Sequence, residues 1–176
     1  MENLQIRQLN LDDEELFLSG LKDWEGNLEW YSFAWKEGMT HAEHIQQLQD
    51  EFHGRNLPSY WVAHTMLYGI LEEKIAGRCS VRHRLNKSLK YCGGHIGYAV
   101  APKYRKRGLG KQLLRAGLQH LKSVSEDTEA LLTVAPSNTA SVRMIEGAGG
   151  VLVMKGWTTG IKDEPTLYYQ IDLSSF

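Results

Sequence analysis

A short basic segment that contains two glycines is the part of the sequence best suited to chemistry. Residues 103–111 hold five cations and no acid, and Gly108 and Gly110 stand among them. Cations attract phosphate groups, and a glycine lets a phosphate oxygen approach the backbone because no side chain is in the way. The composition therefore predicts an anion site, whose cations are Lys103, Arg105, Lys106, Arg107 and Lys111.

Two regular elements would position this segment. The apolar run from Ile96 to Val100 predicts a buried strand, which Pro102 ends because proline cannot donate a hydrogen bond to a neighbouring strand. Leucines then recur at helical spacing and predict a helix with one apolar face, at Leu109, Leu113, Leu114, Leu118 and Leu121. The free N–H groups and the positive dipole end of that helix would point at the glycine turn, where they favour a phosphate.

The order of the residues in this segment is more specific than its composition. Two glycines before a helix also occur in ordinary turns whose basic residues face water, and the segment matches neither a Walker A loop nor a dinucleotide fingerprint. Arg105-Lys106-Arg107-Gly108-Leu109-Gly110 instead resembles the R/Q-x-x-G-x-G/A signature of the GNAT family of N-acetyltransferases. The resemblance implies that residues 105–111 bind the pyrophosphate of acetyl-CoA, a cosubstrate, and that the reaction uses no metal.

The resemblance continues in the C-terminal half. Asn138-Thr139-Ala140-Ser141, followed by Glu146 and Gly149-Gly150, is similar to the family's N-x-x-(A/S)…E-(K/x)-x-G block. The family's asparagine lies near the pantetheine arm, which implies cofactor contacts for Asn138 and Ser141. Taken alone, Asn138 is better explained as the N-cap of a helix, and the two roles are compatible. The segments HIGYAV, RKRGLG and TVAPSNTAS also resemble a bacterial subgroup of predicted acetyltransferases.

The order of expected elements favours an α/β fold with a mixed, mostly antiparallel sheet flanked by helices. A first strand near residues 4–8 precedes helices that begin after Asn10 and Thr40, and a hairpin follows. The later strands and helices are expected at 60–67, 74–83, 95–100, 130–135, 138–146 (a helix), 151–157 and 166–173. This order resembles the GNAT fold along nearly the whole chain, which implies a splayed central strand pair and a single N-acetyltransferase domain over residues 1–176.

In that family the pantetheine lies in the splayed gap like an added strand. The resemblance therefore implies backbone contacts at Tyr98, Ala99 and Val100. A main-chain N–H there would polarise the acetyl carbonyl, where negative charge develops during the reaction. Side-chain identity at these positions carries little information about such contacts.

The proton-transfer groups depart from the family's common pattern. Many members carry a tyrosine seven residues after the asparagine and a glutamate five residues before it, and these positions are Ile145 and Thr133 here. Acetyl transfer to an amine needs a neutral nucleophile and a proton for the departing thiolate. The remaining candidates for proton transfer are His95, Tyr98, His64 and His83. For each, a structural role is the alternative, and solvent could take the proton instead.

Aromatic residues gather between residues 24 and 39 without helical or strand periodicity, at Trp24, Trp30, Tyr31, Phe33 and Trp35. They could pin a loop to the core, or they could form one wall of an acceptor pocket. Glu25, Glu29 and Glu37 lie among them, and aromatic faces with carboxylates suit an amine cation. We expect Glu29 and Trp30 to contribute to the choice of acceptor.

Composition narrows the class of protein. The 176 residues carry a net charge of −1, which argues against a general nucleic-acid or membrane-surface binder. No apolar run is long enough for a membrane span, and the first residues do not begin a signal peptide. Cys79 and Cys92 lack CxxC spacing and fall in expected strands. They are interpreted as free thiols of a cytoplasmic protein, with no metal site.

Together these observations predict an acetyl-CoA-dependent N-acetyltransferase in which a primary amine attacks the thioester directly. The acceptor is a small-molecule or peptide amine of undefined identity, and the chain could also form a homodimer. Because the usual acid and base are replaced, a non-catalytic acyl-CoA-binding sensor or interaction module is the main alternative. A nucleotide- or RNA-binding domain is a weaker one, because basic residues are not spread over a face.

Overall fold

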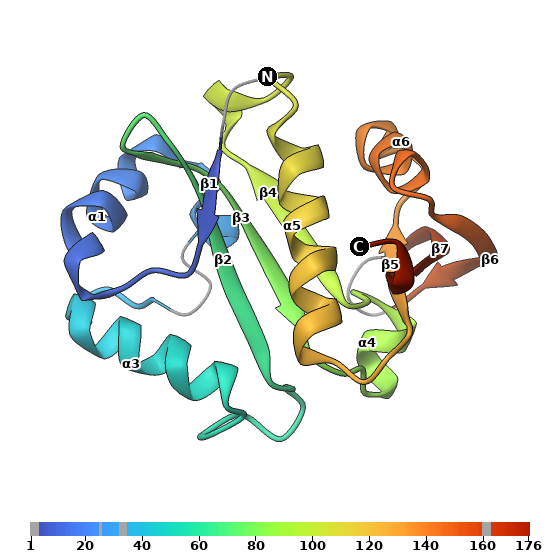
Figure 1. The fold of residues 1–176 in the computed structure, drawn as a ribbon, viewed down its shortest axis with the longest axis horizontal. Coiled ribbons are helices and arrows are strands. Elements are labelled where there is room, and N and C mark those ends of the chain that lie inside the picture. Colours follow the sequence, from blue (N-terminus) through green and yellow to red (C-terminus); the bar gives the residue numbers. More distant parts are fainter. Residues whose placement is uncertain (1–3, 25, 32–34, 160–162) are drawn as a thin grey trace.

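The computed structural model describes residues 4–24, 26–31, 35–159 and 163–176 (Figure 1). Its strands form two antiparallel sheets, one in the order β1-β2-β3-β4 and the other in the order β5-β7-β6. The strands are β1 Gln5–Arg7, β2 His64–Leu71, β3 Lys74–Arg82, β4 Ile96–Val100, β5 Glu129–Val134, β6 Val151–Thr158 and β7 Glu164–Asp172. The expected α/β class, with antiparallel strands and flanking helices, is confirmed.

Helices cover both faces of the first sheet. The α-helices are α1 Glu14–Asp23, α2 Leu28–Tyr31, α3 His41–Phe52, α4 Lys87–Tyr91, α5 Leu109–Val124 and α6 Thr139–Gly147, and the 3-10 helices are η1 Leu11–Asp13, η2 Pro102–Tyr104 and η3 Leu173–Ser175. Gly77 of β3 faces Leu113 of α5, whereas Tyr68 of β2 contacts Phe17 of α1. Figure 1 shows α5 along β3 and β4, with α1 and α3 beyond β1 and β2.

The predicted leucine face of α5 is confirmed, since each of its five leucines is at most 1% exposed. Glycines let this helix lie close to the sheet. A Cβ at Gly77 would lie 2.6 Å from Leu113, and a Cβ at Gly117 would lie 2.7 Å from Cys79 Sγ. Real Cβ atoms do not approach other heavy atoms so closely, so these glycines determine how α5 sits against β3 and β4.

Two predicted helix starts are confirmed by their hydrogen bonds. The Asn10 side chain accepts from the Asp12 N–H at 2.8 Å and begins η1, which leads into α1. Thr40 Oγ1 accepts from the Glu43 N–H at 3.2 Å, and the Thr40 N–H donates to the Glu43 carboxylate at 2.8 Å. This reciprocal pair is a capping box and begins α3.

The β2–β3 hairpin differs from the prediction in its bounds. β2 begins at His64 rather than at residue 60 and continues through Leu71. Every residue of β2 is buried, so the strand lacks the alternation of a half-buried strand. The turn consists of Glu72 and Glu73, whose φ angles are 50° and 57°. Such turns usually contain Asn or Gly, so this acidic pair gave no turn signal.

The sequence analysis missed α4, a helix of little more than one turn. Asn86 caps it by accepting from the Leu89 N–H at 2.9 Å. Cys92 follows this helix, so its expected position in a strand was wrong, whereas Cys79 lies buried in β3. Both thiols are free. Across the described ranges, no helix is both long and apolar enough to cross a membrane.

The two sheets meet where β4 and β5 begin. The His95 N–H donates to the Leu131 carbonyl at 2.8 Å, and the Leu131 N–H donates to His95 Nδ1 at 2.9 Å. Farther along, β4 pairs with β3 and β5 pairs with β7, and no ladder joins β4 to β5 among the described strands. The edge of β4 that faces β5 is therefore unpaired toward its C-terminal end.

Candidate functional site

A cavity of about 640 Å³ lies beside the C-terminal half of β4. Such a volume is typical of small-molecule sites. The predicted cofactor residues that line it are Tyr98, Ala99, Val100, Arg105, Lys106, Gly108, Leu109, Gly110, Asn138 and Ser141. Its other lining residues are Trp24, Asn27, Trp30, Tyr104, Ala140 and Met144. Arg107 and Lys111 belong to the same loop and first helical turn but do not line the cavity. The fold thus brings together three segments of the chain, within residues 24–30, 98–110 and 138–144.

The turn before α5 leaves the start of the helix without a side-chain cap. Gly108 is the N-cap residue, and its φ of 81° lies in the left-handed region that favours glycine. A Cβ at this position would have no heavy atom within 4 Å, so the turn is open. Uncapped N–H groups and the positive end of the helix dipole together form a site suited to an anion.

Tyr104 packs among the cations of the loop. Lys103 Nζ lies 4.9 Å from the centroid of its ring and 2.7 Å from Asp23 Oδ1, and the Arg107 guanidinium lies 5.4 Å from the same centroid. Arg105 Nε donates to the carbonyl of the last residue of β4 at 3.1 Å and so ties the loop to that strand. Sequence reasoning missed this role of Tyr104, because one tyrosine among cations gives no periodic signal.

Asn138 begins α6 as predicted. Its side-chain oxygen accepts from the Ser141 N–H at 3.1 Å, which makes it the N-cap. Gly110 lets α6 approach α5, because a Cβ there would lie 3.0 Å from Met144 Sδ. Asn138 and Ser141 both line the cavity, so the N-cap role of Asn138 is compatible with contact to a ligand. That ligand contact stays a prediction.

Tyr98 places a buried hydroxyl at this cavity. Its Oη makes no hydrogen bond in the part of the chain that the structure describes. Burial raises the pKa of Tyr98, and the nearby Ser141 side chain partly opposes that rise. Buried polar groups nearly always have a partner, and the position of this hydroxyl in the cavity wall, near Ser141, makes it accessible to a ligand atom as well.

His95 lies outside this cavity. It borders a second one, of about 420 Å³, together with Asp127 and Leu131. Its Nε2–H donates to Asp127 Oδ2 at 2.9 Å, and its Nδ1 accepts from Leu131. Burial lowers the pKa of His95, and Asp127 partly offsets this effect. Both ring nitrogens of His95 are therefore used in hydrogen bonds at the junction of β4 and β5. The structure does not bring His95 and Tyr98 into one site.

The other two candidate histidines are also bonded away from the cavity. His64 Nδ1–H donates to a backbone carbonyl at 3.1 Å, and its Nε2 lies 3.1 Å from Glu51 Oε2. His83 Nε2 is hydrogen-bonded to Thr65 Oγ1 at 2.7 Å. Burial lowers the pKa of His83 to about 4. Neither histidine lines the large cavity, and their contacts are those of structural residues.

The two positions that carry an acid and a base in many GNAT proteins have structural roles here. Ile145 is 2% exposed and belongs to the hydrophobic core. Thr133 Oγ1 accepts from the Gly93 N–H at 2.9 Å, which anchors the loop after α4 to β5. Neither side chain can donate or accept a proton at neutral pH.

Most of the aromatic stretch pins its loop to the core. Trp24 is buried and donates to the Ile75 carbonyl at 3.0 Å, and buried Tyr31 donates to the Phe17 carbonyl at 2.6 Å. Trp30 differs, since it is 44% exposed and lines the cavity. Exposed Glu29 is not a lining residue, and Phe33 and Glu25 lie outside the described residues.

Comparisons with known proteins were made for sequence and for structure. A family model described as the acetyltransferase (GNAT) family matches residues 24–149. Comparison with curated proteins gave no significant match. RimJ of Mycobacterium smegmatis, solved in complex with CoA-disulfide, superposes with a TM-score of 0.67 at 18% identity, covering 99% of this chain and 84% of its own.

Two further solved structures have the same fold. The ribosomal-protein-S5-alanine acetyltransferase of Vibrio fischeri superposes with a TM-score of 0.67 at 17% identity, covering 98% of this chain and 94% of its own. The putative acetyltransferase yncA of Salmonella typhimurium, solved with acetyl-CoA, has a TM-score of 0.60 at 14% identity, with 97% and 94% covered. At such identities the likeness concerns the fold alone.

Proposed function

The chain belongs to the acetyltransferase (GNAT) family, and on this basis we propose that it transfers the acetyl group of acetyl-CoA to a primary amine by direct attack of that amine on the thioester. The uncapped, open start of α5 at Gly108 is the observation that carries the proposal. It provides backbone N–H donors and a positive dipole end beside a basic loop, which suit a pyrophosphate.

The residues of the cavity fit the rest of such a ligand. The edge of β4 at Tyr98, Ala99 and Val100 is unpaired and can bond an extended arm through its backbone groups. Asn138 and Ser141 face the same cavity from α6. Bound acetyl-CoA would supply an activated acyl group in the form of its thioester. Main-chain N–H groups of β4 are the donors available to stabilise negative charge on a carbonyl oxygen there.

We assign the proton donor to Tyr98. Its hydroxyl is buried, lines the cavity and lacks a hydrogen-bond partner among the described groups. The raised pKa keeps the phenol protonated at neutral pH, as a general acid must be. His95, predicted from the sequence as a base, is bonded through both nitrogens outside the cavity. The proposal therefore gives His95 a positioning role and leaves deprotonation of the amine to solvent.

We place the choice of acceptor at Trp30 and Glu29. Trp30 lines the cavity with part of its ring exposed, and Glu29 precedes it on α2 with an exposed carboxylate. The ribosomal-protein alanine acetyltransferase named above suggests a peptide amine as one acceptor class, and a small-molecule amine is the other.

Thiol release from acetyl-CoA across a panel of amines, with the N-acetyl product identified by mass spectrometry, tests this function. Amine-dependent thiol release with matching product supports it. The rival hypothesis, a non-catalytic acyl-CoA-binding module, is favoured by the packing roles of Ile145 and Thr133. It predicts saturable CoA binding in calorimetry with no amine-dependent release for any member of the panel.

A further inference from the structure

One arginine of the first sheet has no counter-charge in the part of the chain that the structure describes. Arg82, the last residue of β3, is only partly exposed, and burial lowers the pKa of its guanidinium. Its Nη1 donates to the carbonyls of Gly93 and Gly94 at 3.3 and 3.4 Å, which are long for such bonds. No carboxylate of the described ranges forms an ion pair with Arg82. Because a guanidinium has five N–H donors, these bonds leave Arg82 able to bind an anion.

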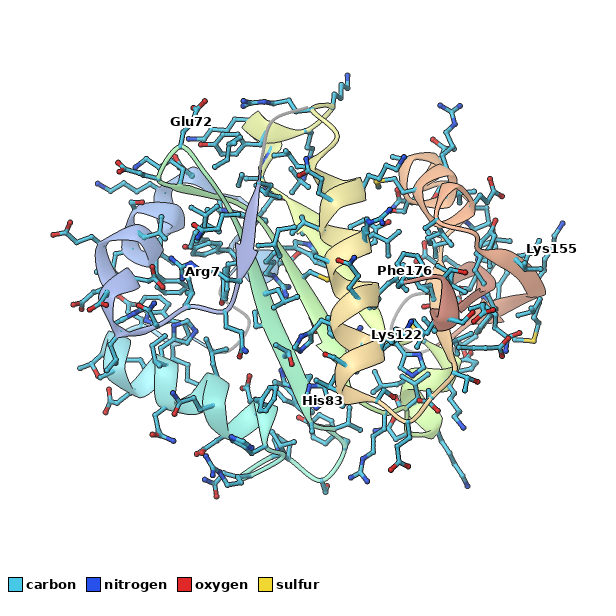
Figure 2. The ribbon with its side chains drawn as sticks, viewed as in Figure 1. Arg7, Glu72, His83, Lys122, Lys155 and Phe176 are labelled. Atoms are coloured by element: carbon cyan, nitrogen blue, oxygen red, sulfur yellow. The ribbon has the colours of Figure 1, made fainter. Side chains whose placement is uncertain are left out.

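The alternation of β3 shows which face of the sheet Arg82 occupies. Cys79 of β3 faces α5, so Arg78 and Arg82 point to the opposite face, which α1 covers. In Figure 2, His83 marks this end of β3, away from the β2–β3 turn at Glu72. Arg78 is 5% exposed, burial lowers its pKa, and the positive charge of Arg82 adds to this effect. This face of β3 therefore carries two positive charges that influence each other.

The neighbouring strand β4 has small residues beside these arginines. Ala99 lies opposite Arg78 in the β3–β4 ladder and lines the large cavity, and Gly97 lies two residues before it. A Cβ at Gly97 would lie 3.4 Å from Arg82 Nη1, so the guanidinium lies against the bare backbone of β4. Gly97 and Ala99 are both partly exposed, although β4 lies in the middle of the molecule (Figure 1). A row of small residues thus leads from Arg82 to the wall of the large cavity.

We propose that Arg82 binds a carboxylate of the acceptor, and that the acceptor is an amino acid with a short link between its amine and its carboxylate. This inference rests on the proposed function, because it assigns a second group of the same acceptor. Gly97 precedes Tyr98 and Ala99, whose backbone would bond the arm of the cofactor, by one or two residues. That is about 3–7 Å along a strand, which a short amino acid and one hydrogen bond can span. Arg82 is a binding residue in this proposal and takes no part in the acetyl transfer.

Opposite charges at the two ends of the acceptor fit the residues around the cavity. The exposed carboxylate of Glu29 and the ring of Trp30 suit the amine cation, whereas the guanidinium of Arg82 can bind a carboxylate through two parallel hydrogen bonds. A polyamine would instead bring a further positive charge toward Arg82, which disfavours it. The carboxylate would also compensate a charge that the fold leaves partly buried.

Matched pairs of acceptors test the proposal. Values of kcat/KM are measured for the common amino acids and for the carboxamide of each one that is acetylated. The amine of the carboxamide is less basic, so reactivity alone would favour the carboxamide at neutral pH. We expect the amino acid to be favoured by about 10–100-fold, mainly through KM. Equal values for the two, or turnover of only those amines that lack a carboxylate, overturn the proposal.

Variants of the arginine locate the preference. Arg82→Gln should abolish it, and Arg82→Lys should retain part of it because the charge remains. Arg84→Gln is the matched control, since Arg84 is exposed and lies two residues farther along the chain, and this variant should keep the native preference. Circular dichroism verifies that each variant is folded. A folded Arg82→Gln chain with the native preference overturns the assignment.

Calorimetry with product analogues separates this inference from the proposed function, because it needs no turnover. N-acetylglycine and N-acetylglycinamide, which differ only in the carboxylate, are titrated into the native chain loaded with CoA. The native chain should bind N-acetylglycine about 10–100-fold more tightly. A chain that shows this difference but acetylates no amine would contradict the proposed function and support the carboxylate site. Equal affinities, or no binding of either compound, overturn the carboxylate site whatever the chain does with amines.

Discussion

Replacing Gly108 with aspartate is the sharpest perturbation of the proposed cofactor site. A Cβ at this position meets no heavy atom within 4 Å, so the side chain fits without a clash. The φ of 81° costs a residue with a Cβ roughly 1–2 kcal/mol. Native domains are typically stable by about 5–15 kcal/mol, so the variant should fold.

The new carboxylate would stand next to the expected pyrophosphate. Two unit charges about 5 Å apart repel by roughly 3 kcal/mol at an effective dielectric constant of about 20. Gly108 is exposed, and solvent and salt reduce this repulsion. We therefore expect Gly108→Asp to lose about 1–3 kcal/mol of binding free energy, which is roughly a 5- to 150-fold loss of CoA affinity.

Gly108→Asn is the matched control. Asparagine has nearly the same shape as aspartate, tolerates a positive φ and carries no charge. Isothermal titration calorimetry with CoA should find Gly108→Asn within a few-fold of the native affinity and Gly108→Asp well below it. The gap between the two variants should narrow as salt is added. Equal CoA affinities of the two folded variants at low salt would refute the placement of the pyrophosphate at this turn.

Three further predictions follow from individual side chains. Tyr98→Phe should lower kcat by about 10²–10⁴-fold with little change in CoA affinity, and an unchanged kcat would remove Tyr98 as the acid. Trp30→Ala and Glu29→Gln should each raise the KM for the acceptor and leave the KM for acetyl-CoA unchanged. A loss of thermal stability with unaltered acceptor kinetics would instead show that Trp30 and Glu29 only attach their loop to the core. Burial lowers the pKa of His44 and His83 to about 4, so the unfolded chain binds more protons below about pH 6.5. The free energy of unfolding should fall from pH 6.5 to 4 in urea titrations, and His83→Gln should make that fall shallower; an identical pH dependence in the variant would contradict the assignment.

The sequence predicted best what short-range patterns determine. The leucine stripe of α5 and the capping box at Thr40 depend on residues a few positions apart, and both are confirmed. The basic glycine turn is likewise local, and it does stand between β4 and α5. α4 escaped prediction because a single turn has no periodicity, and its only signal was the capping Asn86. Because β2 is buried on both faces, its sequence lacks the alternation of apolar and polar residues from which its first residue could have been predicted.

Features that depend on distant pairing could not be predicted from residue patterns. The isolation of His95 from the cavity follows from its bonds to Asp127 and to Leu131, more than thirty residues away. The exposure of β6 follows from its place at the edge of the second sheet. In the sequence, its run of apolar residues is indistinguishable from a core strand, because hydrophobicity does not report which neighbours a strand acquires.

The replacements at positions 133 and 145 have one physical explanation in this structure. Thr133 anchors Gly93 after α4, and a glutamate there would exchange a neutral acceptor for a charge in a partly buried place. Ile145 is 2% exposed and packs closely under the turn after α6, where a Cβ at Gly150 would lie 2.6 Å from its Cγ2, so this position belongs to the core. Since both positions have structural roles, the proposed reaction requires a proton donor from another element that borders the cavity. β4 is such an element, and Tyr98 is the residue on it whose buried hydroxyl lacks a partner in the described chain.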